Sequence, residues 1–153
     1  MTLDATKPTD QDLVSALAAY IRENRVSINA ISGSGNVGVT DLTIAAGATS
    51  LTVGSDLGSY GLELVVVTGS GVATLATILG GTEGQIKILV FQDGNINIVD
   101  GAKANGNFYL NHLPALSNFE PDQDDVLAIV NIGGDGASTY GYWKELFRTI
   151  SVK

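Results

Sequence analysis

The chain has 153 residues, of which 44% are hydrophobic and 16% are charged, so it has enough apolar material for one compact domain with a short appendage. Sixteen acidic and eight basic residues give a net charge of −8, which is the wrong sign for a phosphate-binding surface and argues against nucleic acid as a partner. The absence of cysteine excludes disulfides, thiolate metal sites and a cysteine nucleophile.

A helix is predicted over residues 10–31, a segment without glycine or proline that contains several Leu, Ala, Arg and Glu residues. Thr9 is a suitable N-cap, and Asp10 and Asp12 fall in the first turn, where negative charge complements the helix dipole. At about 1.5 Å per residue, such a helix extends for about 33 Å. We therefore expect residues 1–31 to form a helical anchor or stalk.

An apolar stripe with alternating spacings of three and four residues runs along this predicted helix. It consists of Val14, Leu17, Ile21, Asn24, Ile28 and Ile31. Such a heptad seam predicts self-association, and isoleucine at both seam positions favours a homotrimer whose register is set by the one polar member. The alternative is that the helix packs on its own β domain, because three alanines and Tyr20, all within residues 16–20, widen the stripe.

A hinge is predicted over residues 32–38, where the sequence SGSGNVG holds three glycines and a single long apolar residue. The charge differs on its two sides. Residues 1–31 hold four acidic and three basic residues, a balance of −1, whereas the rest of the chain holds twelve and five, a balance of −7. We therefore place a domain boundary at the hinge and expect an acidic β domain over residues 39–153.

From residue 39 onward, short segments rich in β-branched residues follow one another without an intervening helix. Turn residues separate them, including the pairs Asp93-Gly94 and Asn105-Gly106, which suit tight hairpins. The pattern predicts a mainly β fold, with an antiparallel β-sandwich or barrel-like domain preceded by the N-terminal α-helix. We find no convincing internal repeat in the sequence.

Two of these segments are almost continuously apolar rather than alternating. Residues 62–67 read LELVVV, which predicts a central strand that is covered on both faces. Residues 86–91 read IKILVF and predict a similar strand, with Lys87 near an edge or an end.

No catalytic, cofactor-binding or metal-binding residues are predicted, so we expect no enzyme. The one histidine, His112, has no nucleophile motif around it, and one histidine without cysteine does not make a usual zinc site. The acidic stretch 120–125 offers oxygen ligands for calcium but lacks EF-hand spacing, which favours a solvated loop. The glycine-rich segments match neither the P-loop nor the dinucleotide fingerprint.

No segment predicts insertion into a membrane or secretion. No uninterrupted apolar run approaches the roughly 18 residues of a spanning helix. Residues 1–12 are polar and acidic rather than basic and then apolar. We expect a soluble protein with no membrane partner and no secretory signal.

The aromatic residues near the C-terminus are the candidates for recognition of another surface. Tyr140, Tyr142 and Trp143 could form a sugar-stacking surface. The alternative is that alternate members of the segment YGYWKELF pack into the core, while the charged residues of this region face solvent or pair across strands.

Segments spread over most of the chain carry a family resemblance. They include the opening TDQDLVSALAAYIRENRVSINAI, the central GGTEGQIKILVFQDGNINIVDG and the closing YWKELFRTISV. The recurring features are a glycine-bounded strand at Gly81–Ile86, the turn Asp100-Gly101, the strand Asp125–Ile129, and a final strand with Trp143, Glu145 and Arg148. Together these segments resemble the β-rich ends of fibres and the capsid-decorating proteins of tailed bacteriophages.

The resemblance implies a virion structural protein that assembles as a homotrimer, with the N-terminal segment as anchor and the β domain projecting outward. We expect a capsid decoration (cement) or head-fibre protein that binds the major capsid protein through its N-terminal segment and stabilises or ornaments the shell. Such a protein is made in the host cytoplasm, is located on the capsid surface of the virion, and needs no metal or cofactor. The alternative is a tail-fibre tip or receptor-binding module that recognises a host surface glycan.

Overall fold

The computed structural model describes residues 37–111, 118–134 and 140–149, which belong to one compact unit built from β-strands. The prediction of a mainly β domain is confirmed for these residues. The predicted helix with its seam and most of the predicted hinge lie outside the described residues, as does His112, so these remain predictions. The first strand begins at Val37, two residues before the predicted start of the β domain.

Six strands form the larger sheet. In spatial order they are β1 (Val37–Ile44), β3 (Leu62–Gly69), β6 (Ile86–Phe91), β10 (Val126–Gly134), β11 (Tyr140–Thr149) and β8 (Phe108–Tyr109). Alternate residues of β3 and β6 are buried, because successive side chains of a strand point to opposite faces. Both strands have neighbours on either side, so the two apolar runs do form interior strands of the sheet.

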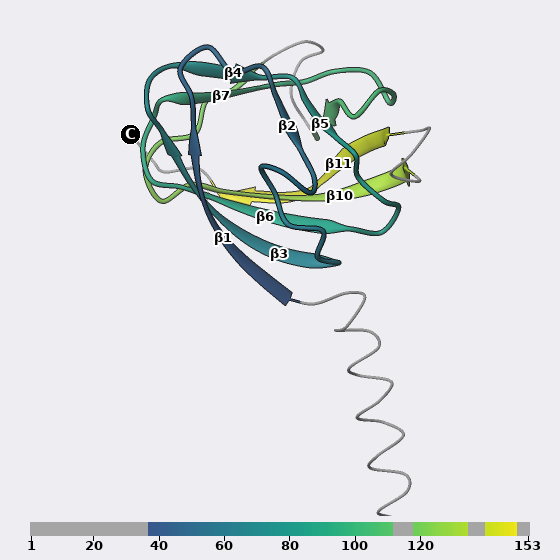
Figure 1. The fold of residues 1–153 in the computed structure, drawn as a ribbon. Coiled ribbons are helices and arrows are strands. Elements are labelled where there is room, and N and C mark those ends of the chain that lie inside the picture. The colour runs from purple at the N-terminus through teal and green to yellow at the C-terminus, as the bar shows by residue number, and fades with distance from the viewer. Residues whose placement is uncertain (1–36, 112–117, 135–139, 150–153) are drawn as a thin grey trace, which may run out of the picture. The chain divides into compact units, whose positions relative to one another are not determined.

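Shorter strands form a second layer over one face of this sheet (Figure 1). They are the pair β2 (Ser50–Thr52) and β5 (Thr77–Leu79), and the three strands β4 (Ala73–Leu75), β7 (Ile96–Val99) and β9 (Asn118–Phe119). The buried side chains that fill the core between the layers include Val65, Leu75, Ile78, Leu89, Ile96, Ile98, Phe108 and Trp143. We call the side of the large sheet that points into this core the inner face, and the opposite side the outer face.

The chain winds through both layers as a coil (Figure 1). After β1 it crosses to β2 in the second layer, returns to the large sheet as β3, crosses again through β4 and β5, and returns as β6. Both of these returns place the new strand parallel to the previous one. Val37 pairs with Leu62, and Leu62 pairs with Ile86, so successive turns of the coil are 25 and 24 residues long.

The prediction of an antiparallel domain is therefore wrong. Among the described strands, five neighbouring pairs are parallel and three are antiparallel, so the sheets are mixed. Successive side chains point to opposite faces in both kinds of sheet, and this chain connects parallel neighbours through strands of the second layer instead of helices. The coil is hard to recognise in the sequence as an internal repeat. Its successive 25- and 24-residue turns share the alternation of inner and outer positions but few identical residues.

Two of the predicted turns, Asn105-Gly106 and Asp93-Gly94, have different roles. Asn105-Gly106 forms a tight turn in which both residues have positive φ angles, 58° and 74°, and a backbone hydrogen bond of 3.0 Å closes it. Asp93-Gly94 does not close a hairpin, because it lies at the corner where the chain leaves β6 for β7 in the other layer. The Asp93 carboxylate accepts two backbone N–H groups there, each at 2.9 Å.

Candidate interaction surface

The inner face carries a buried ion pair between β3 and β6. Glu63 and Lys87 are paired neighbours, their carboxylate and ammonium lie 2.5 Å apart, and both side chains are fully buried. The Lys87 ammonium also donates to the carbonyl oxygens of Gly58 and Tyr60, at 2.6 and 3.3 Å. The other carboxylate oxygen of Glu63 accepts the Gly58 N–H at 2.8 Å and the Thr40 hydroxyl. The pair is thus saturated with hydrogen bonds.

Burial changes the pKa of Lys87. Desolvation lowers the pKa of Lys87 from its usual 10.5, while the hydrogen bond and the negative charge of Glu63 act in the opposite direction. Lys87 is the second residue of β6, so its predicted position near an end is confirmed. The sequence did not indicate its burial, which is tolerated because Glu63 and two carbonyl groups replace the water around the ammonium.

A second ion pair lies on the inner side of β11. Arg148 donates from Nε and Nη2 to the two carboxylate oxygens of Glu145, at 2.7 and 2.5 Å. The Asn111 N–H donates to the same carboxylate at 2.7 Å, and the guanidinium lies 4.9 Å from the ring centroid of Phe119 in the second layer. The side chains of Arg148 and Glu145 are only 10% and 4% exposed, so they pair with each other instead of facing solvent.

The outer face of the same sheet is apolar. Strand pairing aligns its side chains in three rows: Val37, Leu62, Ile86, Val130 and Lys144; Val39, Leu64, Ile88, Ala128 and Phe147; and Asp41, Val66, Val90, Val126 and Thr149. Twelve of these fifteen residues are apolar, and the two charged ones lie toward opposite edges, Asp41 on β1 and Lys144 on β11. We call these fifteen residues the apolar face.

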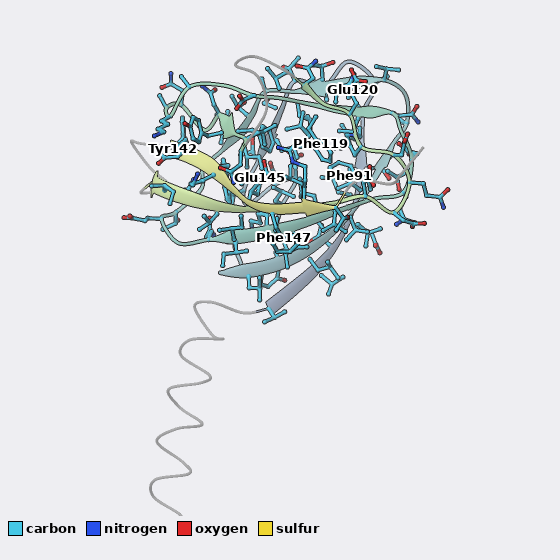
Figure 2. The ribbon with its side chains drawn as sticks, turned by 180° about the vertical axis from the view of Figure 1, so that it is seen from behind. Phe91, Phe119, Glu120, Tyr142, Glu145 and Phe147 are labelled. Atoms are coloured by element: carbon cyan, nitrogen blue, oxygen red, sulfur yellow. The ribbon has the colours of Figure 1, made fainter. Side chains whose placement is uncertain are left out.

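Much of the apolar face is accessible. Val37 and Val39 are each 67% exposed and Phe147 is 53% exposed, while most of the residues between them are half-buried. Figure 2 shows Phe147 on the opposite side of β11 from Glu145. From ordinary strand spacing, five strands and three rows span on the order of 500 Å². This lies in the upper part of the range for the largest apolar patch of a typical monomer, and such patches are often functional.

Two apolar runs in the sequence indicate this face. Residues 62–67 and 86–91 predict strands covered on both sides, which is typical of strands that alternate little. The structure covers their inner side with the second layer, whereas their outer side belongs to the apolar face. The expected cover on both sides is therefore confirmed for the inner side only, while the outer residues of both runs are half-buried.

A separate cavity of about 480 Å³ opens where the end of β10 and the start of β11 meet the β7–β8 connection. Its side-chain lining includes Lys103, Asn105, Ile132, Tyr140 and Tyr142. The cavity therefore brings the tight turn of the β7–β8 connection next to two of the three aromatic residues predicted for surface recognition. Aromatic and polar groups that converge in a concave site are typical of small-molecule binding.

Trp143 does not belong to this surface. Tyr140 is 38% exposed and Tyr142 is half-buried, but Trp143 is fully buried and its indole N–H donates to the Ile78 carbonyl at 2.9 Å. Neighbouring side chains of a strand point to opposite faces, so Trp143 enters the core where Tyr142 does not. The predicted recognition set is thus reduced to the two tyrosines.

The acidic stretch 120–125 forms a turn that leads into β10. Asp125 is buried, and its carboxylate accepts the N–H of Asp122 at 2.8 Å, which closes the turn before β10. Within the ranges that the structure describes, no three His, Asp or Glu side chains come together in a way that could hold a metal ion.

Comparisons with known proteins do not assign this surface to a family. No family model matches the chain, and neither a curated protein nor a solved structure matches it. Among residues 37–111, 118–134 and 140–149, no helix is long and apolar enough to cross a membrane.

Proposed function

We propose that this chain is a non-enzymatic structural protein that assembles into a homotrimer through the apolar face. The observation that carries the proposal is the distribution of polarity on the large sheet. Its inner face holds two ion pairs, while twelve of the fifteen residues on its outer face are apolar. An antiparallel or mixed sheet with one face in water ordinarily places polar residues on that face. An apolar face indicates that a partner covers it.

A second copy of the chain is the partner that fits best. The apolar face has only one acidic and one basic residue, so it offers little to a strongly charged partner. The heptad seam within residues 14–31 independently predicts self-association, and the segment that carries it joins the β domain at Val37, a member of the apolar face. A standard interface buries about 800 Å² per partner, which the face and the seam together can supply.

The resemblance to phage decorating proteins supplies the biological setting of the proposal. The trimer is a capsid decoration (cement) or head-fibre protein of a virion, and the segment 1–31 of each copy binds the major capsid protein. Three weak arms on one trimer act at high effective concentration, so the trimer holds to the shell more firmly than one arm does. The cavity beside Tyr140 and Tyr142 favours a second candidate, a receptor-binding module that recognises a host surface glycan.

Light scattering on the full chain tests the trimer. We expect a mass of three times 15.8 kDa, and we expect Ile88→Asp to dissociate the trimer because it places a carboxylate in the middle row of the apolar face. The matched control is Thr68→Asp, which introduces the same charge on the outer side of β3 beyond the three rows. Circular dichroism verifies that both variants are folded.

The measured mass decides between the two predictions for the helix, which are self-association with other copies and packing on its own β domain. A monomeric full chain would overturn the proposal and favour a helix that packs on its own β domain. A folded Ile88→Asp variant that remains trimeric would also overturn it, because the apolar face would then lie outside the interface.

Antibody-gold electron microscopy tests the virion setting, with serum raised against residues 39–153. Labelling over the phage head supports the decoration proposal, and deletion of residues 1–31 should then abolish binding to the capsid. Labelling confined to the tail would favour the receptor-binding candidate.

A further inference from the structure

We infer that the cavity beside Tyr140 and Tyr142 binds an anionic sugar unit of a surface polysaccharide. The inference rests on the second candidate function, whose ligand class it names, and it does not depend on trimer assembly. It rests on three observations about the cavity: its aromatic walls, the lysine in its lining, and the contacts that hold its frame.

The aromatic walls favour a pyranose ring. Tyr140 and Tyr142 both line the cavity, and Tyr140 is 38% exposed. A tyrosine offers an apolar ring for the C–H face of a sugar and a hydroxyl for its polar edge. The Asn105 side chain adds an amide that can donate to and accept from sugar hydroxyls. A volume of about 480 Å³ lies within the range of small-molecule sites.

The charge beside the cavity favours an anion. The described residues include four basic side chains, and two of them, Lys87 and Arg148, are held in buried ion pairs. The other two, Lys103 and Lys144, both lie against the ring of Tyr109, at 4.8 and 5.2 Å from its centroid. None of the described lining residues is acidic, although the β domain has a charge balance of −7.

The frame around the cavity is held in place before a ligand binds. Tyr109 packs edge-on against Tyr142 with a centroid distance of 5.8 Å, and Lys144 donates to the Asn111 side chain at 2.9 Å. Asn105 belongs to the tight turn with positive φ angles. A preorganised site loses less conformational entropy on binding, which favours recognition of a small ligand.

The anion can be a carboxylate or a phosphate, because a lysine ammonium forms charge-assisted hydrogen bonds with either. Titration of the full chain with digalacturonate, galactobiose, galactose 1-phosphate and inorganic phosphate separates these sources. Amide chemical shifts of residues 103–105 and 140–142 report whether each probe occupies the cavity. We expect digalacturonate, galactose 1-phosphate or both to bind about 10-fold more tightly than neutral galactobiose. Tighter binding of digalacturonate identifies the ligand as a carboxylated polymer, and tighter binding of galactose 1-phosphate identifies it as a phosphorylated polymer.

Variants test separately the lysine that recognises the anion and the tyrosine that stacks on the sugar. Lys103→Gln should remove the preference for the anionic sugar, whereas Lys103→Arg should retain it. Tyr140→Ala should weaken the binding of all the sugars by a similar factor, because it removes the stacking ring and leaves both lysines in place. Val72→Ala is the control, because Val72 is 66% exposed and lies in the β3–β4 connection, away from the cavity lining.

Three results would overturn the inference. The first is equal binding of digalacturonate, galactose 1-phosphate and galactobiose, or no binding of any sugar. The second is binding of inorganic phosphate as tight as that of the anionic sugars, which would indicate an anion site without sugar recognition. The third is binding that shifts other amides and is unaffected by Lys103→Gln and Tyr140→Ala.

Discussion

The inner and outer faces of the large sheet bear opposite kinds of side chain, although the same strands form both. On β6, Lys87 points into the core while Ile86 and Ile88 point away from it. The inner face accepts charge because the neighbouring strand and two loop carbonyls supply hydrogen-bond partners for it. Within residues 37–111, 118–134 and 140–149, the outer face has no comparable network, and twelve of its fifteen aligned side chains are apolar. The comparison shows that a residue's polarity alone does not tell which way it points.

The largest expected effect comes from breaking the inner ion pair. Lys87→Met leaves the Glu63 carboxylate buried without its cation, and we expect it to reduce the free energy of unfolding by about 3–5 kcal/mol. The double variant Glu63→Leu/Lys87→Met removes both charges, so its stability should return to that of the natural chain or exceed it. Urea unfolding monitored by circular dichroism measures both. A single variant that costs less than about 1 kcal/mol would show that water reaches the pair.

The adjacent residues Ile88 and Leu89 compare the two faces directly, since they differ in direction but not in strand. Leu89→Ala opens a cavity in the core and should cost about 2–5 kcal/mol at every protein concentration. In the proposed trimer Ile88→Ala removes a contact between copies, so its melting temperature should fall mainly at low protein concentration. Thermal unfolding over a dilution series distinguishes them. Identical concentration dependence in both variants would argue against an intermolecular role for the apolar face.

A smaller effect is expected from pH, through the lowered pKa of Lys87. Below this pKa the folded chain carries the full cost of burying the ammonium, and the cost is relieved as the pH rises toward the usual value of 10.5. The natural chain should therefore gain stability relative to Glu63→Leu/Lys87→Met as the pH increases from neutral into this range. Urea unfolding of both proteins across the range measures the difference. A relative loss of stability would mean that the pKa is raised instead.

The smallest expected change concerns the predicted seam, which lies outside the described residues. Asn24→Ile should raise the thermal stability slightly while allowing other registers or strand numbers, because a buried polar residue in a seam selects one arrangement. Light scattering and thermal unfolding follow the two effects. If neither the oligomer distribution nor the melting temperature changes, the segment is not a self-associating seam.

The aromatic part of the candidate site can be predicted from the sequence. Tyr140 and Tyr142 were identified from their place in an aromatic segment, and both line the cavity. Trp143 was grouped with them wrongly, because the position of the core relative to β11 is not apparent from the segment alone. The sequence gives Lys103 no role and predicts for Lys144 only that it faces solvent or pairs across strands. The two lysines converge on Tyr109 only because β8 pairs with β11 and the β7–β8 connection is adjacent.

By itself the sequence determined the properties that depend on neighbouring residues. These are the mainly β character, the interior strands at 62–67 and 86–91, and the tight turn at Asn105-Gly106, because alternation, β-branching and turn conformation are local. Only the tertiary structure decided that β1, β3 and β6 run parallel and that Glu63 meets Lys87 in the core. Strand direction and register depend on where the chain re-enters the sheet after crossing the second layer, and that is settled by packing between segments far apart in the sequence.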